Sequence, residues 1–86
     1  MENVKVFIMA RRGPGGRTVL RSAMDEEGVG VHRLKAATGV NHQTLANLAN
    51  GRGGVEKQKA ERIAEALGRP VGSLFVHKDG ADLVEF

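Results

Sequence analysis

Residues 39–51 read GVNHQTLANLANG, a stretch without a single Asp, Glu, Lys or Arg. Between its two glycines, side chains that donate and accept hydrogen bonds surround Leu45 and Leu48. Leucines three residues apart lie on the same face of a helix. Asn41 is of a type that caps helix N-termini, and Gly51 is of the type that ends helices in a left-handed conformation. The stretch therefore predicts a helix with one apolar face and one polar, uncharged face.

A second predicted helix comes immediately before this one. Residues 31–38 place Leu34 inward, and Gly39 ends the helix because glycine adopts positive φ without steric cost. Val40 is expected to fill the turn, and the two leucines of the following helix are expected to pack against Leu34. Such a corner between two helices is rigid and directs the far face of the second helix outward.

The remaining helices are predicted by local signals of the same kind. Thr18 is a candidate N-cap before apolar residues at helical spacing, and Gly28 ends that segment. A longer helix is expected over about 56–67, where the apolar positions form one stripe. Residues 71–76 are expected to form one short helix.

The two ends of the chain contain residues that favour strands. Residues 3–9, NVKVFIM, are rich in β-branched and aromatic types, and residues 82–86, DLVEF, are similar. A lone strand leaves its backbone groups unpaired, so we expect these segments to pair as a short two-stranded ribbon. The pairing could join the ends of one chain or the ends of two chains.

The predicted fold is therefore mainly α, with five helices. The helical domain spans 18–76, after an N-terminal strand and an Arg/Gly-rich arm over 1–17. Residues 77–86 form a tail that contains the candidate strand.

Two pieces of the sequence resemble one known family. Residues 28–51, GVGVHRLKAATGVNHQTLANLANG, and residues 59–75, KAERIAEALGRPVGSLF, are similar to the lambda-repressor-like, Cro/XRE-type helix-turn-helix proteins. The resemblance covers about 18–76 and implies a five-helix domain whose third helix enters the DNA major groove. Members of this family read base edges from the N-terminal part of that helix.

The resemblance also implies roles for individual residues. Neutral amides suit base edges because they both donate and accept hydrogen bonds. Val31 departs from a glutamine that is common in the family at the start of its second helix, and His32 or Arg33 is expected to take over that phosphate contact. The positions that the resemblance assigns to base reading are His42, Gln43 and Asn47; those that it places near the DNA backbone are Asn41, Thr44, Asn50 and Arg52, with a thymine methyl as the alternative contact of Thr44.

Residues 11–17, RRGPGGR, cannot form regular structure because they contain three glycines and a proline. The segment lacks the Lys-Ser/Thr ending of a phosphate-binding P-loop. Its three arginines, Arg11, Arg12 and Arg17, suit an arm that contacts DNA phosphates or a minor groove. The alternative is a simple linker.

Composition excludes several classes of protein. The 86 residues suffice for one domain with a small core, and the net charge of +3 suits a polyanionic partner. With no cysteine and no pair of histidines at i, i+4 spacing, no metal site is expected. No residues suggest a catalytic constellation, so neither enzyme activity, a cofactor nor a small-molecule ligand is expected. With no secretory signal and no apolar run of roughly 20 residues, we expect a cytoplasmic protein that does not span a membrane.

The sequence thus predicts a sequence-specific regulator of transcription, Cro-like or repressor-like and of phage type, that reads double-stranded operator DNA with the helix over 41–50. One such helix covers few base pairs, so a homodimer on DNA is expected. The alternative is an antitoxin or adaptor that uses the same fold to bind protein. An excisionase-type architectural protein is a third option, although those usually contain a winged helix.

Overall fold

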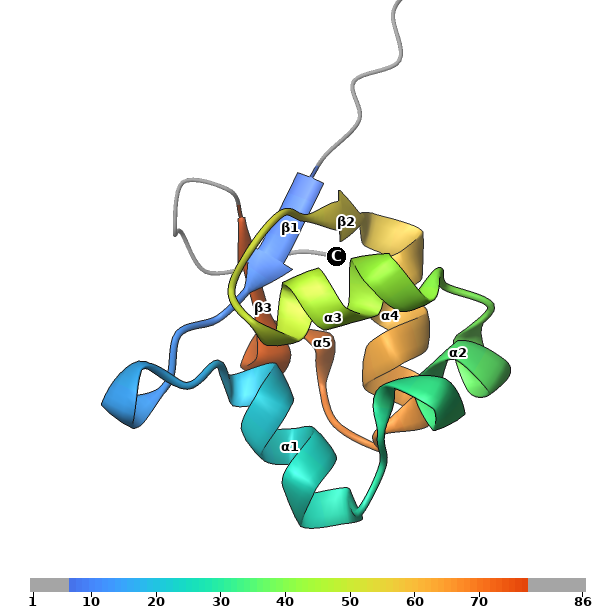
Figure 1. Ribbon diagram of the computed structural model, residues 1–86. Coiled ribbons are helices and arrows are strands. Elements are labelled where there is room, and N and C mark those ends of the chain that lie inside the picture. Colours follow the sequence, from blue (N-terminus) through green and yellow to red (C-terminus); the bar gives the residue numbers. More distant parts are fainter. Residues whose placement is uncertain (1–6, 78–86) are drawn as a thin grey trace, which may run out of the picture.

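The computed structural model describes residues 7–77 and shows a mainly α domain with a small antiparallel sheet (Figure 1). The prediction of a mainly α domain with five helices is confirmed for these residues. The helices are α1 (Val19–Glu27), α2 (Val31–Thr38), α3 (His42–Ala49), α4 (Lys57–Ala66) and α5 (Val71–Leu74), with a 3₁₀ turn η1 (Pro14–Gly16) before α1; the strands are β1 (Phe7–Ala10), β2 (Val55–Glu56) and β3 (Phe75–His77).

The helix ends lie where the capping residues predict them. The Thr18 side chain caps α1 by accepting a hydrogen bond from the Arg21 backbone N at 3.0 Å. Gly28 ends α1 with φ 67°, and Gly39 ends α2 with φ 76°, a region that favours glycine. These ends depend on local chemistry, which explains why the sequence predicts them within a residue or two.

The sheet differs in part from the predicted ribbon. Strand β1 lies in the middle and pairs antiparallel with both β2 and β3, with Ile8 opposite Val55 and His77. The predicted N-terminal strand over 3–9 is thus present over Phe7–Ala10, while residues 1–6 lie outside the described residues. The candidate strand over 82–86 also lies outside them, so its pairing with the N-terminal segment remains a prediction.

The predicted short helix over 71–76 is wrong at its C-terminal end. The chain leaves the helix at Phe75, which is extended with φ −131° and ψ 157°, and continues as β3. Phe75 and Val76 are buried, and β3 satisfies its backbone groups against β1. Pairing with a strand distant in sequence therefore overrides the local helical signal.

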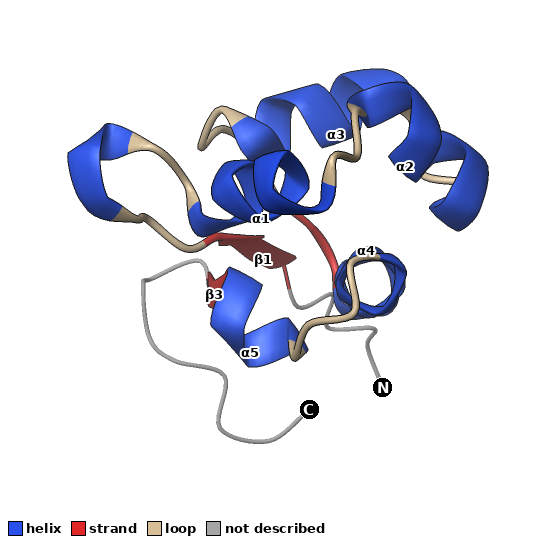
Figure 2. Cartoon of the chain, turned by 90° about the horizontal axis from the view of Figure 1, so that it is seen from below, coloured by secondary structure: helices blue, strands red, loops and turns tan. Residues whose placement is uncertain are grey.

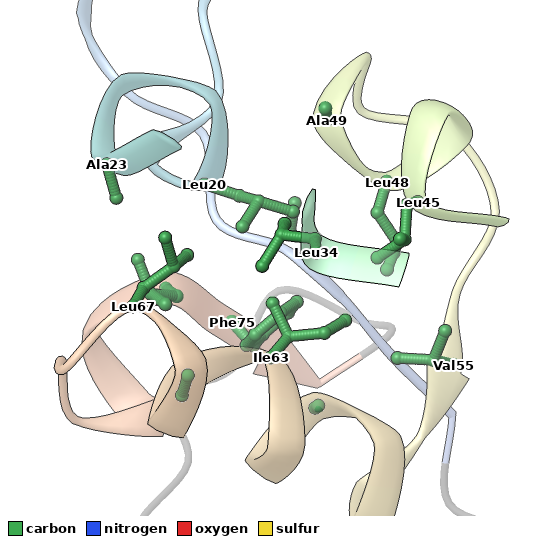
Figure 3. Close-up of a cluster of buried hydrophobic side chains, with 14 of the residues drawn as sticks. Leu20, Ala23, Leu34, Leu45, Leu48, Ala49, Val55, Ile63, Leu67 and Phe75 are labelled. Carbon is green, nitrogen blue, oxygen red and sulfur yellow. The ribbon is translucent and has the colours of Figure 1, made fainter. Parts of the chain in front are cut away.

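The core lies between the helices and the sheet. In Figure 3, Leu20 of α1, Leu34 of α2 and Ile63 of α4 converge from three elements, with Leu45 and Leu48 of α3 beside them. All five side chains are at most 1 % exposed. Figure 2 shows α2 and α3 along one side of the molecule and α4 and α5 along the other, with β1 between. This packing leaves one long face of α3 on the surface.

An ion-pair cluster joins the end of α1 to the turn before α5. Arg69 contacts Glu26 at 2.8 Å and Glu27 at 3.1 Å, and these hydrogen bonds raise the pKa of the guanidinium above its ordinary value. The cluster is exposed to solvent, so we expect it to orient the turn more than to stabilise the fold. In the part of the chain that the structure describes, no helix has the length and hydrophobicity needed to cross a membrane.

Candidate functional site

The turn between α2 and α3 is fixed by three hydrogen bonds. The Thr38 hydroxyl donates to the Leu34 carbonyl at 2.6 Å and accepts from the Val40 backbone N at 3.1 Å. The Gly39 backbone N donates to the Lys35 carbonyl at 2.8 Å. Because Thr38 and Val40 are buried, water cannot replace these bonds. The angle at which α3 leaves the turn is therefore determined by α2.

Thr38→Val tests this turn. Valine keeps the shape of threonine but leaves the buried Val40 N–H without its acceptor, which costs about 1–3 kcal/mol of stability. We expect a lower denaturation midpoint with an unchanged slope in urea, measured by circular dichroism. Thr38→Ser retains the hydroxyl and should lose clearly less; equal losses for the two variants would contradict the role given to the hydroxyl.

Helix α3 has two chemically distinct faces. Its buried face consists of Leu45, Leu48 and Ala49. Its other face has exposed or half-exposed polar side chains without charge, as predicted from the leucine spacing. These are Asn41 at the N-cap, then His42, Gln43, Thr44 and Asn47.

Two contacts order the polar face of α3. The Asn41 side chain accepts hydrogen bonds from the backbone N of Gln43 at 2.7 Å and of Thr44 at 3.4 Å. The Gln43 side-chain Nε2 donates to Asn47 Oδ1 at 3.2 Å. One helical turn separates these two amides, so together they present a row of donors and acceptors.

The structure also brings two histidines together at the start of α2 and α3. The rings of His32 and His42 have centroids 5.1 Å apart and planes tilted by 42°. This proximity could not be seen in the sequence, because the two histidines belong to different helices. Two ligands do not complete a zinc site, and residues 7–77 contain no group of three or more His, Cys, Asp or Glu placed to hold a metal.

Basic residues lie both before and after α3 in the sequence. Arg33 on α2 and Arg52 after α3 are exposed, and the Arg52 backbone N donates to the Asn47 carbonyl at 2.7 Å. The charged side chains over 28–55 are Arg33, Lys35 and Arg52, and this range contains no Asp or Glu. The segment that contains α3 is therefore net positive, although α3 itself has no charged residue.

The Arg/Gly-rich segment forms a closed loop rather than an extended arm. The Gly13 backbone N donates to the Arg17 carbonyl at 2.7 Å, and Arg12 and Thr18 form an isolated antiparallel bridge. A Cβ on Gly13 would lie 2.8 Å from the Arg17 carbonyl oxygen, so only glycine fits there. In Figure 1 this loop is the blue coil at the left, just before the start of α1.

The three arginines of this loop differ in exposure and in their contacts. Arg12 and Arg17 are exposed, and Arg17 forms an ion pair with Asp25. Arg11 is half-buried, and its guanidinium donates to the Gly72 carbonyl of α5 at 3.1 Å. The structure thus places the Arg11 guanidinium against α5. This hydrogen bond ties the start of the loop to α5, and the expectation that Arg11 contacts DNA stays a prediction.

An open hollow of about 300 Å³ lies between the loop, α1 and the end of α3. We call it the Arg17–Asn50 hollow; its lining residues are Gly15, Gly16, Arg17, Arg21, Ala49 and Asn50. Arg17 and Asn50 are among the residues that the sequence predicts for the site, whereas Arg21 is not. No sequence signal indicates it, since only the packing of α1 against α3 brings Arg21 near Asn50.

No family model, curated protein or solved structure matches this chain. A function must therefore be inferred from the chemistry of the surface described above.

Proposed function

We propose that the protein is a sequence-specific DNA-binding regulator of the lambda-repressor-like, helix-turn-helix type, in which α3 enters the major groove. The observation that supports this most is the uncharged polar face of α3, held outward by a rigid turn. An ordinary solvated helix face contains charged residues, whereas base edges require groups that donate and accept hydrogen bonds.

The size of α3 suits this role. With its side chains an α-helix is about 10–12 Å in diameter. The major groove of B-DNA is about 12 Å wide and admits an α-helix. Gln43 and Asn47 are spaced to reach neighbouring base pairs, and either amide can form a donor–acceptor pair with adenine.

The charges around α3 fit the DNA backbone. Arg33 and Arg52 are exposed and lie before and after α3 in the sequence, and phosphate contacts from such residues position a reading helix. His32, near the N-terminus of α2, is a further candidate for phosphate contact. One α3 covers few base pairs, and two-fold dimers of helix-turn-helix proteins read two half-sites about one turn of DNA apart, so we infer that the protein binds as a homodimer.

The test of this proposal is selection of binding sites from random duplex DNA at two salt concentrations. We expect enrichment of one sequence, arranged as an inverted repeat if two copies bind. Binding without enrichment would contradict sequence reading. A stable complex with a partner protein in the absence of any DNA binding would favour the antitoxin or adaptor function.

Arg52→Ala is expected to distinguish a phosphate contact, which positions the protein on DNA, from contacts that read bases. Loss of one phosphate contact weakens binding to selected and random duplexes about equally, and it lowers the salt slope of log K by about 0.9. Fluorescence anisotropy titrations at four salt concentrations measure both quantities. Arg62→Ala, on the exposed side of α4, removes the same charge on another element and is the matched control. An Arg52→Ala salt slope equal to that of this control would rule out the contact.

A further inference from the structure

The Arg17–Asn50 hollow has the chemistry of an anion site. Two arginines and Asn50 line it, and the remaining lining residues are two glycines and Ala49. On the loop side the hollow is bordered by Gly15 and Gly16, which have no side chains. Their φ angles of 71° and 79° lie in the region that favours glycine. No carboxylate is among the lining residues.

The walls of the hollow are held by the fold. The buried Thr18 hydroxyl donates to the Ala49 carbonyl at 2.8 Å, which ties the start of α1 to the end of α3. The same hydroxyl caps α1 through the backbone N of Arg21. Arg21 is therefore positioned relative to Asn50 by one residue that contacts both elements.

A carboxylate outside the hollow already pairs with both arginines. Asp25 Oδ2 contacts Arg17 Nη1, and Asp25 Oδ1 lies 4.0 Å from Arg21 Nε. The side chain of Asp25 is 52 % exposed, that of Arg17 is 55 % exposed and that of Arg21 is 48 % exposed. Exposed pairs of this kind contribute little to stability, so another anion can replace Asp25 at small cost. A phosphate fits because guanidinium groups bind carboxylates and phosphates with the same planar geometry.

We propose that the Arg17–Asn50 hollow binds one phosphate of the DNA backbone, and that Asp25 competes with this phosphate for Arg17 and Arg21 in the free protein. The inference rests on the proposed function and adds Arg21 and Asp25 to it. The hollow lies at the C-terminal end of α3, where the DNA backbone borders a groove that α3 occupies. Asp25 thereby lowers affinity for every duplex, and only a phosphate placed in the hollow displaces it.

The experiment measures duplex affinity for five variants, three test variants and two controls, by anisotropy at several salt concentrations. Arg21→Ala should bind selected and random duplexes about tenfold more weakly and lower the salt slope by about 0.9, while Arg21→Lys should lie between it and the parent. Asp25→Asn should bind both duplexes severalfold more tightly. Arg62→Ala and Glu61→Gln, on exposed positions of α4, are the matched controls for the two changes of charge.

A double-mutant cycle separates competition from a general change of charge. If Asp25 acts through the two arginines, Asp25→Asn should give no gain in a chain that already has Arg17→Ala and Arg21→Ala. A gain of the same size in that background would overturn the competition. Melting curves of all variants establish that each is folded.

The outcomes distinguish this inference from the proposed function. If the parent binds a selected duplex and Gln43→Ala weakens that binding, but Arg21→Ala behaves like Arg62→Ala, only the hollow assignment fails. If the parent enriches no duplex, both fail. Titration with inorganic phosphate, followed by the amide resonances of Gly15 and Gly16, tests the other source of the same chemistry. Saturable phosphate binding without any effect of Arg21→Ala on DNA would assign the hollow to a free phosphate compound and overturn the proposal.

Discussion

Leu45→Ala is expected to lower the free energy of unfolding by about 2–5 kcal/mol. Leu45 is 1 % exposed and lies in the core with Leu34 and Leu48. Removing three carbon atoms loses their burial and leaves a cavity where α2 and α3 meet. In a domain of this size, such a loss lowers the melting temperature by roughly 8 °C or more. Thermal and urea unfolding followed by circular dichroism measure it.

Two variants make this prediction specific. Leu45→Met conserves volume and should cost less than about 1.5 kcal/mol. Ala substitution of the exposed Gln43, two residues earlier on the same helix, should leave the melting temperature within a degree or two of the parent. A Leu45→Ala melting curve that overlays the parent would contradict the packing of α3 described here, without any reference to DNA.

The helices could be predicted because their starts and ends depend on neighbouring residues. Thr18 and Asn41 accept hydrogen bonds from backbone N–H groups two or three residues later, as N-caps do. Gly28 and Gly39 take positive φ at the ends of α1 and α2. None of these interactions needs a distant part of the chain, so the pattern of residues suffices.

The strands could not be predicted to the same extent because they depend on partners far along the chain. Val55 is buried beside β1, although its neighbours form a loop-like sequence of glycines. Phe75 follows a short helix directly, and its extended backbone is explained by pairing of β3 with Ala10. Local propensity says nothing about such contacts, and here tertiary packing decides the structure.

In the candidate site, too, features within one helix could be predicted from the sequence, whereas contacts between distant residues could not. The polar face of α3 follows from two leucines and a cap within one helix, so Gln43 and Asn47 could be predicted to share a surface. The sequence could not show that Arg11 differs from Arg12 and Arg17 in its surroundings. Its contact is with the Gly72 carbonyl, 61 residues later in the chain. Arg21 is near Asn50 only through the packing of α1 against α3.

Gln43→Ala is expected to reduce affinity for the selected duplex by about 1–3 kcal/mol, which is roughly 5- to 150-fold, with much less effect on random DNA. The substitution removes an amide that can donate to and accept from one base. It changes no charge, so the salt slope should remain that of the parent. Gln58→Ala, at an exposed position of α4, is the matched control and should alter neither affinity.

The hydrogen bond from Gln43 to Asn47 gives this prediction a second part. In the free protein the Gln43 amide donates to Asn47 Oδ1, so each side chain limits the orientation of the other. If both amides read bases as a unit, the losses of Gln43→Ala and Asn47→Ala should not add, and the double variant should lose less than their sum. Site selection repeated with Gln43→Ala should show relaxed preference at one base pair in each half-site, while the flanking preferences persist. An equal loss on selected and random DNA would instead place Gln43 against the backbone, and α3 would then not be the helix that reads sequence.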